Sequence, residues 1–504
     1  MNNWIKGFIC LSFILSIFSA CTPKEGPQKP NIIYIMADDL GWQDVGFMGS
    51  QWFETPNLDA LAKKSKVFTD AYMYPTCSPS RAALLTGRQS FRTGVYTVPV
   101  LERGDNKTNI FSRWTVGHEH PVYAEPLNEA GYRLIHLGKW HIVGPSPEDE
   151  VDFPYEKHLI QHPNGDTSWV KRHKEEYQQY YPTGRGFDEN VGGTWWGDPA
   201  RGYAEGYKSE SGGYKAPFKN PFIKDKEDDE WLTDRLTDEA IDFIKRNDPA
   251  KTGDPFFVNL HFYAPHRPIV PRSAEDYQRF IEKAPDTITG QGIKRREEAA
   301  GYATMSASID DNVQRIVDYL DEKGLRENTV IIFTSDNGFN GLTSTTNTLR
   351  GSKGMVYEGG IRVPAFVNWK GTIAPGVSHS PICGMDYFPT FLELAGITDY
   401  SEQLDGKSLV PLWKGEEDLE RPLFWHLASA YKNPPCSIIR KGKWKLIQFL
   451  NSGKLELYNL EEDLKESHNL VDQEEDVAQE LLEELTTWRK DNDVPLPPAS
   501  VLEY

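Results

Sequence analysis

Four short polar groups in this chain each follow a run of apolar residues, and each holds side chains that can bind a cation or an anion. The adjacent carboxylates Asp38 and Asp39 follow the first run, and Asp336 with Asn337 follows a later one. Carboxylate and amide oxygens are hard ligands, which suit calcium better than zinc or copper. Without a metal, carboxylates facing one another would repel and raise their pKa values. Taken singly, each group is also typical of an ordinary turn after a strand.

The two remaining groups carry lysine and histidine. Lys139 and His141 stand two residues apart in the segment Gly-Lys-Trp-His, so in an extended chain both side chains point to the same side. His266 follows Pro265 in the segment Ala-Pro-His-Arg-Pro, and Lys353 lies in a glycine-containing segment further on. A lone lysine or histidine is usually a surface residue. Their role therefore depends on whether the fold brings them together.

Cys77 opens the segment Cys-Ser-Pro-Ser-Arg-Ala-Ala-Leu-Leu-Thr-Gly-Arg. Ser78 and Pro79 favour a helix start, the Ala-Ala-Leu-Leu run continues the helix, and Gly87 suits its end. This places Cys77 at a helix N-terminus, where unpaired N–H groups and the helix dipole favour an anion. The spacing Cys-x-Pro-x-Arg would arise by chance in roughly a few per cent of chains this long, so alone it is only suggestive.

Apolar runs rich in β-branched residues predict the strands that position these groups. The predicted strands lie at residues 31–37, 133–137, 256–263 and 330–334. Helical patterns between them lie at residues 57–65, 80–85, 125–130, 231–246 and 296–320. This alternation predicts an α/β fold, a three-layer sandwich with a large central, mostly parallel sheet. Because ligands bind beyond the carboxyl ends of such strands, the four polar groups should converge in space.

The chain divides into four predicted parts. Residues 1–20 contain a lysine and a short apolar stretch, which indicates a signal peptide. The following Cys21 ends a lipobox-like Ser-Ala-Cys sequence, so we expect a lipid on Cys21 and a tether over residues 21–30, with plain cleavage as the alternative. Residues 31–381 should form the catalytic domain. Residues 382–504 should form a C-terminal α+β subdomain, with a helix at 386–396, antiparallel strands at 437–440, 443–447 and 455–458, and a helix at 474–489.

Composition narrows the partners and the redox chemistry. With 74 acidic and 55 basic residues the net charge is -19, which argues against nonspecific binding to nucleic acid or an anionic membrane. Contact with a membrane is expected only through the lipid on Cys21, and an anionic substrate needs a local cationic pocket. Beyond Cys21 only Cys77, Cys383 and Cys436 remain, so the chain is no disulfide scaffold. Cys383 and Cys436 either pair or are two buried thiols.

The segment that begins at Cys77 resembles the signature of the formylglycine-dependent type I sulfatases, which belong to the alkaline phosphatase-like superfamily. The resemblance runs from Asn31 to about Pro364, with a weaker match to the end, and rests on several motifs in the expected order. It implies that a maturation enzyme oxidises Cys77 to formylglycine, whose hydrate is the nucleophile. It also implies one Ca²⁺ bound by Asp38, Asp39, Asp336, Asn337 and the modified Cys77.

The same resemblance implies a catalytic set consisting of Cys77, Arg81, Lys139, His141, His266 and Lys353. Arg81 would lie beside the formylglycine and the others around the sulfate. His266 or Lys353 would then donate a proton to the leaving sugar oxygen, and His141 would remove the proton that lets sulfate depart. Glu358 and Arg362 match the family as well, and we interpret them as a structural ion pair.

The sequence indicates less clearly which residues bind the sugar of the substrate. The long loop region from 145 to 230 contains aromatic and charged residues that either hold a sugar or pack the loop. These residues are Arg172, His173, Trp195, Trp196, Asp198 and Arg201. We expect exo-acting hydrolysis of sulfate esters on short sulfated oligosaccharides of host or algal glycans, with galactose-type or hexosamine sugars as leading candidates. The expected location is the periplasm or outer membrane of a Gram-negative bacterium.

Two other functions fit parts of the pattern. A phosphoester hydrolase of the same superfamily would normally use serine or threonine as nucleophile, often with a two-metal site richer in histidine, so Cys77 and the lysine pair favour sulfate. A noncatalytic glycan-binding lipoprotein would keep the pocket and never receive the aldehyde. Mass spectrometry of the Cys77 peptide distinguishes that protein from an enzyme.

Overall fold

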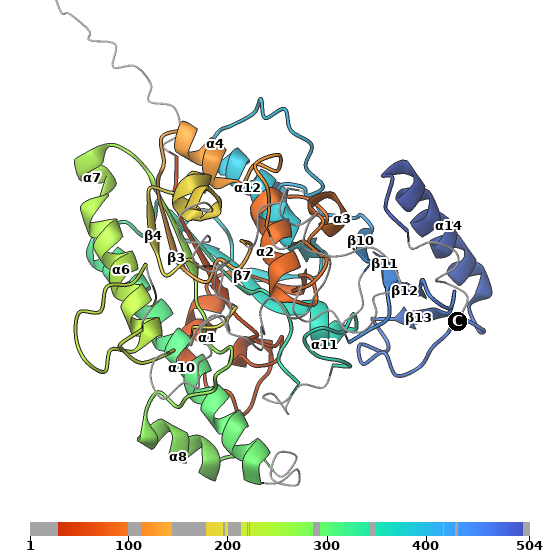
Figure 1. Ribbon diagram of the computed structural model, residues 1–504, viewed down its shortest axis with the longest axis horizontal. Helices are drawn as coiled ribbons and strands as arrows, with labels where there is room; N and C mark the ends of the chain where they lie inside the picture. The colour runs from red at the N-terminus through yellow and green to blue at the C-terminus, as the bar shows by residue number, and fades with distance from the viewer. Residues whose placement is uncertain are drawn as a thin grey trace, which may run out of the picture.

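The computed structural model describes residues 29–98, 112–113, 115–143, 178–194, 197–199, 213–218, 220, 222–285, 293–341, 349–416, 418–428 and 432–496. Within these residues the predicted α/β architecture is confirmed. A mixed sheet of nine strands, mostly parallel, lies between two layers of helices, and a four-stranded antiparallel sheet lies to one side of it (Figure 1).

The strands of the large sheet run in the order β4-β3-β5-β1-β6-β7-β2-β8, with β9 paired to β2. Their bounds are β1 (Asn31–Ala37), β2 (Lys66–Tyr72), β3 (Arg133–Gly138), β4 (Glu189–Val191), β5 (Phe256–His261), β6 (Thr329–Ser335), β7 (Arg362–Trp369), β8 (Gly376–Ser378) and β9 (Ile382–Cys383). The four predicted strands are β1, β3, β5 and β6, and they are neighbours in parallel pairs. Only β7 runs against its neighbours β6 and β2.

Helices cover both faces of this sheet. Their bounds are α1 (Pro56–Ala62), α2 (Cys77–Thr86), α3 (Ser90–Thr93), α4 (Ala124–Glu129), α6 (Leu232–Arg246), α7 (Pro249–Thr252), α8 (Ala274–Glu282), α10 (Ile293–Glu322), α11 (Glu358–Ile361), α12 (Tyr387–Leu394) and α13 (Val410–Lys414). The five helices predicted between the strands correspond to α1, α2, α4, α6 and α10. None of the helices in the described part of the chain is long and apolar enough to cross a membrane.

Alternating residues of β1 pack against the helix layers on the two faces of the sheet. Ile32 and Tyr34 point into a core shared with α2, α4 and α12, whereas Ile33 and Ile35 point into a core shared with α1, α6 and α10. Both cores are fully enclosed, so β1 is buried along its length and apolar on both faces after Asn31. The buried central strands give a rigid base for the polar residues that follow their carboxyl ends.

The C-terminal sheet forms the predicted α+β unit. It consists of β10 (Leu423–Leu427), β11 (Cys436–Lys441), β12 (Trp444–Phe449) and β13 (Leu455–Asn459) in sequential antiparallel order. Helix α14 (Glu475–Asp491) packs Leu481 and Leu485 against Ile439, Leu446 and Leu457 on one face of that sheet. The strands and the last helix predicted from the sequence are confirmed, and β10 is an addition.

The segment that follows residue 381 belongs to the large sheet. β9 pairs with β2, and α12 buries Tyr387 and Phe391 beneath the central strands. The antiparallel sheet itself begins only at Leu423. Because a helix next to a two-residue strand gives no sequence signal for the sheet it joins, the composition change near residue 382 marks the end of the longer strands and not the start of the second sheet.

The structure decides between the two alternatives for the remaining cysteines. Cys383 and Cys436 are buried free thiols and do not pair. The loop region from 145 to 230 lies largely outside the described residues. Its described parts contain β4 at the sheet edge and the short 3-10 helices Gln178–Tyr180 and Pro182–Arg185.

Candidate active site

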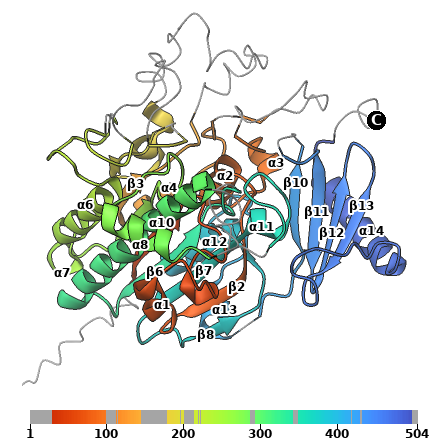
Figure 2. The ribbon, with the colours of Figure 1, turned by 90° about the horizontal axis from the view of Figure 1, so that it is seen from below.

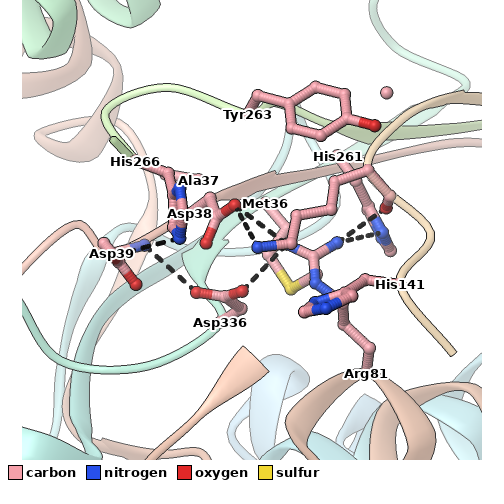
Figure 3. Close-up of polar contacts among 12 residues, drawn as sticks. Met36, Ala37, Asp38, Asp39, Arg81, His141, His261, Tyr263, His266 and Asp336 are labelled. Carbon is pink, nitrogen blue, oxygen red and sulfur yellow. Dashed lines mark hydrogen bonds and ion pairs between the residues drawn. The ribbon is translucent and has the colours of Figure 1, made fainter. Parts of the chain in front are cut away.

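The polar groups after the four predicted strands meet at one edge of the sheet. β3, β5, β1 and β6 are consecutive neighbours there, and α2 begins beside their carboxyl ends. Figure 3 shows Asp38, Asp39 and Asp336 turned toward one another, with His266 next to Asp39 and with Arg81 and His141 on the other side. The convergence that the topology predicted is therefore present.

Backbone and side-chain hydrogen bonds join the two acidic loops. The Asp39 N–H donates to Asp336 Oδ1 at 3.1 Å, and the Asn337 amide donates to Asp39 Oδ1 at 2.8 Å. Ser335 adds a further link, since its hydroxyl accepts from the Leu40 N–H and donates to the Asn337 carbonyl, both at 3.1 Å. The loops after β1 and β6 are thus held as one unit.

Three oxygen atoms of this unit are left without a donor. Asp38 Oδ1, Asp39 Oδ2 and Asn337 Oδ1 are buried and have no hydrogen-bond partner within the described part of the chain. The ligand atoms of Asp38, Cys77 and Asp336 all lie within 4.8 Å of one another. Buried oxygens without donors are costly. The donor set therefore fits a hard cation bound through oxygen.

Each of the three carboxylates has a close cationic partner, and Arg81 also lies 4.0 Å from Asp38 Oδ2. Lys139 Nζ lies 2.6 Å from Asp38 Oδ2, and Lys353 Nζ lies 2.5 Å from Asp39 Oδ1. The corresponding partner of Asp336 is the Arg81 guanidinium, at 2.8 Å from Oδ2. Burial opposes the charge on Lys353, but the negative groups around it, Asp39 foremost, together outweigh burial and keep the pKa of this lysine well above its usual value. The site therefore holds fixed positive charges beside the oxygens that lack donors.

Cys77 lies at the first position of α2, as predicted. Thr76 before it is extended, and Gly87 ends the helix with a left-handed φ of 64°. The thiol is almost fully buried, and burial raises its pKa even though Lys139 and Lys353 act in the opposite direction. An unmodified Cys77 thus stays a neutral thiol and is a poor nucleophile.

The two site histidines are kept neutral by their surroundings. Burial lowers the pKa of His141 and of His266, and the nearby cations Lys139 and Lys353 lower both further. His266 Nε2 lies 3.8 Å from Asp39 Oδ2, and Nδ1 is 2.7 Å from the Arg267 carbonyl.

The backbone at His141 is not in the extended conformation that we expected from the sequence. β3 ends at Gly138, and His141 takes a left-handed φ of 61°. Its N–H donates to the Thr194 carbonyl at 3.0 Å, so contacts with another loop, and not strand geometry, orient it. A Cβ on Gly197 would come within 2.8 Å of His141 Nε2, so this glycine leaves room for the imidazole.

Arg81 binds several site residues at once. Its guanidinium donates to the Lys139 carbonyl at 2.7 Å and to Asp336, and it lies 3.2 Å from His261 Nδ1. It therefore ties α2 to the loop after β3 and to the acidic loop after β6. His261 was not singled out from the sequence, because it lies inside a predicted strand.

Tyr302, which no sequence pattern singles out, supports the main chain of Asp39. The Tyr302 hydroxyl, on α10, lies 2.8 Å from the Asp39 carbonyl and 2.7 Å from Asp44 Oδ2. Asp44 also accepts the Gly41 N–H at 3.1 Å. Asp39 itself has a left-handed φ of 68°, so these contacts hold its backbone in an uncommon conformation.

Of the six predicted sugar-contacting residues, only Asp198 is described. Arg172, His173, Trp195, Trp196 and Arg201 lie outside the described residues. Asp198 follows Gly197, which contacts His141, so it is near the site. Burial raises the pKa of the Tyr263 hydroxyl, and the negative charge of Asp198 adds to that effect.

The interpretation of Glu358 and Arg362 as an ion pair is confirmed. Arg362 Nη1 lies 3.0 Å from Glu358 Oε2, and both side chains are buried. Glu358 also pairs with Lys445 of β12 at 2.9 Å, and Arg362 pairs with Asp70 of β2 at 3.1 Å. These contacts link the antiparallel sheet to the large sheet and do not enter the site.

Comparisons with known proteins agree with this arrangement. A family model described as Sulfatase matches residues 30–397, and one described as N-sulphoglucosamine sulphohydrolase, C-terminal, matches residues 351–491. A Sulfatase of Formosa agariphila is 32% identical over 531 residues, covering 95% of this chain and 92% of that protein. The N-acetylgalactosamine-6-sulfatase of Canis lupus familiaris is 33% identical over 441 residues, covering 83% and 72%.

Solved structures lead to the same class. Ps i-CgsB is 30% identical with a TM-score of 0.70, covering 93% of this chain and 94% of that chain. A second structure of Ps i-CgsB, in complex with k-i-k-neocarrahexaose, is 29% identical with the same TM-score and covers 94% and 96%. Fold and site thus define an alkaline phosphatase-like hydrolase. The chain belongs to the sulfatase family, and it is a sulfuric ester hydrolase.

Proposed function

We propose that the protein removes sulfate esters from carbohydrates with a formylglycine formed from Cys77 and with one bound Ca²⁺. The observation that carries the proposal is the position of Cys77 at the N-terminus of α2, within 4.8 Å of the ligand oxygens of Asp38 and Asp336. A helix N-terminus, a cation and fixed lysines in one place suit a sulfate group, which carries negative charge in the ground state and the transition state.

The metal would be held by Asp38, Asp39, Asp336 and Asn337 together with an oxygen of the modified Cys77. Its positive charge would withdraw electrons from the sulfate group and stabilise the charge that develops during attack. The three oxygens without donors support this assignment. The aldehyde hydrate would supply two hydroxyls, one to attack sulfur and one whose proton is later removed to expel sulfate.

The chain's own residues would bind the group and move the protons. Lys139 and Lys353 supply positive charge on two sides of the carboxylates. Lys353, which keeps its proton, would protonate the sugar oxygen as its bond to sulfur breaks. His266 is the alternative donor and, being neutral, would first have to take up a proton. The neutral His141 would then accept the proton that releases sulfate, a role that its lowered pKa supports because the imidazole is free to take a proton.

The substrate class is inferred from relatives. One relative is named N-acetylgalactosamine-6-sulfatase, and the related Ps i-CgsB was solved with an oligosaccharide. The net charge of -19 disfavours a long polyanion, so we propose exo-acting desulfation of a terminal sugar on short oligosaccharides, galactose-type or hexosamine.

We also propose that the protein works in the cell envelope. The leader of residues 1–20 and the lipobox-like Cys21 support export and a lipid anchor, in the periplasm or at the outer membrane. Metabolic labelling with a radioactive fatty acid tests this, with Cys21→Ser as the unlabelled control. Absence of label on the wild-type chain would contradict the anchor.

The test of the main proposal combines mass and rate. The Cys77 peptide from a host with a maturation enzyme should carry the aldehyde, and sulfate release from sulfated saccharides should depend on it. Cys77→Ala should abolish turnover and Cys77→Ser should nearly do so, because neither forms a hydrate that eliminates sulfate. Activity above about a hundredth of wild type in the alanine variant would refute the mechanism, since losing a nucleophile normally costs several orders of magnitude. A noncatalytic binding protein would keep an intact thiol in its native host.

A further inference from the structure

The segment that carries Lys353 lies between the active site and the antiparallel sheet. This segment runs from Leu349 to α11 and has no regular structure before Glu358. Figure 2 shows α11 between the large sheet and the antiparallel sheet. Two hydrogen bonds hold the main chain of the Lys353 segment toward the active site. The Lys353 N–H donates to the Phe339 carbonyl at 2.8 Å, and the Gly354 N–H donates to the Pro75 carbonyl at 2.6 Å.

Lys432 and Asn433, which precede β11, bind the main chain of the same segment. Lys432 Nζ donates to the carbonyl of Lys353 itself at 2.5 Å. The next residue, Asn433, accepts the Val356 N–H through Oδ1 at 3.0 Å. Lys353 is therefore fixed at three atoms: its N–H by Phe339, its carbonyl by Lys432, and its ammonium by Asp39.

Further contacts from β13 and from the segment after it anchor both ends of the Lys353 segment. Arg350 Nη1 donates to the Tyr458 hydroxyl at 2.8 Å and to the Glu466 carbonyl at 2.9 Å. At the other end the Glu358 N–H donates to Glu466 Oε2 at 2.6 Å. The C-terminal family model starts at residue 351, so it joins the Lys353 segment and this sheet in one matched unit.

We propose that Lys432 is a positioning residue for Lys353, and that the antiparallel sheet is a working part of the active site because it sets where the Lys353 ammonium lies. The inference rests on the proposed function, taken with Lys353 as the group that protonates the leaving oxygen. A charged donor on a carbonyl is a strong hydrogen bond, and small displacements of a catalytic group have large effects on rate.

The arrangement has a consequence that a merely structural role does not have. If Lys432 holds Lys353, its loss should matter most for esters whose leaving group needs stabilisation, such as sugar sulfates. An activated aryl sulfate such as 4-nitrocatechol sulfate leaves with little help from an acid and should be less affected. The main chain around Lys353 should also become more open to solvent.

The experiment uses the full chain with three variants. Lys432→Met removes the donor and keeps the apolar stem, Lys432→Arg keeps a charged donor, and Lys443→Met is the control, at the turn between β11 and β12. Rates are measured on the formylglycine form with a sulfated disaccharide and with 4-nitrocatechol sulfate. Amide hydrogen exchange over residues 349–361 is measured on every protein, including the form with unmodified Cys77.

For Lys432→Met we expect kcat on the disaccharide to fall at least about tenfold and kcat on the aryl sulfate to fall less than about threefold. Exchange over 349–361 should rise, Lys432→Arg should recover most of the loss, and Lys443→Met should match wild type. Equal losses on both substrates, or unchanged exchange, would overturn the proposal. If wild type cleaves neither ester, the proposed function has failed, and the exchange comparison alone decides whether Lys432 positions the segment.

Discussion

Replacing Glu466 with glutamine should remove a pH-dependent loss of stability. Glu466 and Glu358 are both fully buried and share the Lys445 ammonium, at 2.8 Å and 2.9 Å. Burial opposes the charge on Glu358, but Lys445 and Arg362 outweigh it and lower its pKa to about 2. Burial raises the pKa of Glu466 to about 7, because Lys445 compensates only in part and Glu358 adds repulsion.

The sign and size of the change in unfolding free energy with pH follow from the pKa of Glu466. Its folded-state value of about 7 lies above the ordinary value of 4.5, so the folded protein binds this proton more tightly than the unfolded chain. The resulting stability is fully present below pH 4.5 and is lost as the pH rises through about 7. At about 1.4 kcal/mol per pH unit, the total is roughly 3.5 kcal/mol. The lowered pKa of Glu358 acts only below pH 4.5, outside this window.

Urea denaturation at saturating calcium and constant ionic strength, from pH 5 to pH 8.5, measures the effect. Wild type should lose roughly 2.5 kcal/mol more unfolding free energy across this range than Glu466→Gln does, because the range begins above pH 4.5. The exposed Glu462→Gln is the matched control and should follow wild type. Wild-type and Glu466→Gln curves that run parallel would refute the reasoning.

Three further predictions concern the active site. Asp336→Ala should weaken calcium binding more than Asn337→Ala, because it removes a charge; calorimetric titration giving the reverse order contradicts this ligand set. Tyr302→Phe should weaken calcium binding about tenfold, the effect of losing one buried hydrogen bond of about 1.4 kcal/mol, and an unchanged affinity would remove its supporting role. Gly197→Ala should displace His141 and lower kcat at least about tenfold with calcium affinity unchanged, so full activity would show that the imidazole has space to spare.

The strands that could be predicted from the sequence are those buried on both faces. β1, β3, β5 and β6 lie between helices on both faces, so their residues are mostly apolar and nearly all buried. β2 and β7 were missed because their polar residues have partners far along the chain. Asp70 in β2 pairs with Arg440 of β11, and Pro364 in β7 lies at a register shift where no ladder bond is needed.

The residues of the candidate site were likewise predictable only in part. Residues directly after a strand could be selected, because the topology of an α/β sheet brings strand ends together. Tyr302 and His261 could not be selected, since one lies within a helix and the other within a strand. Tyr302 acts through a hydrogen bond to a residue 263 positions away, and no local pattern marks that contact.

Helix α2 has a consequence for the order of events in making the active protein. All ten of its residues are buried, and Cys77 is only 2% exposed. An enzyme that oxidises this side chain must take the surrounding peptide into its own active site, and the folded protein offers none of it. The oxidation that we propose must therefore precede the closing of the sheet and helices around α2. Protein that folds in a host without the maturation enzyme would stay inactive when that enzyme is added later, unless it is first unfolded.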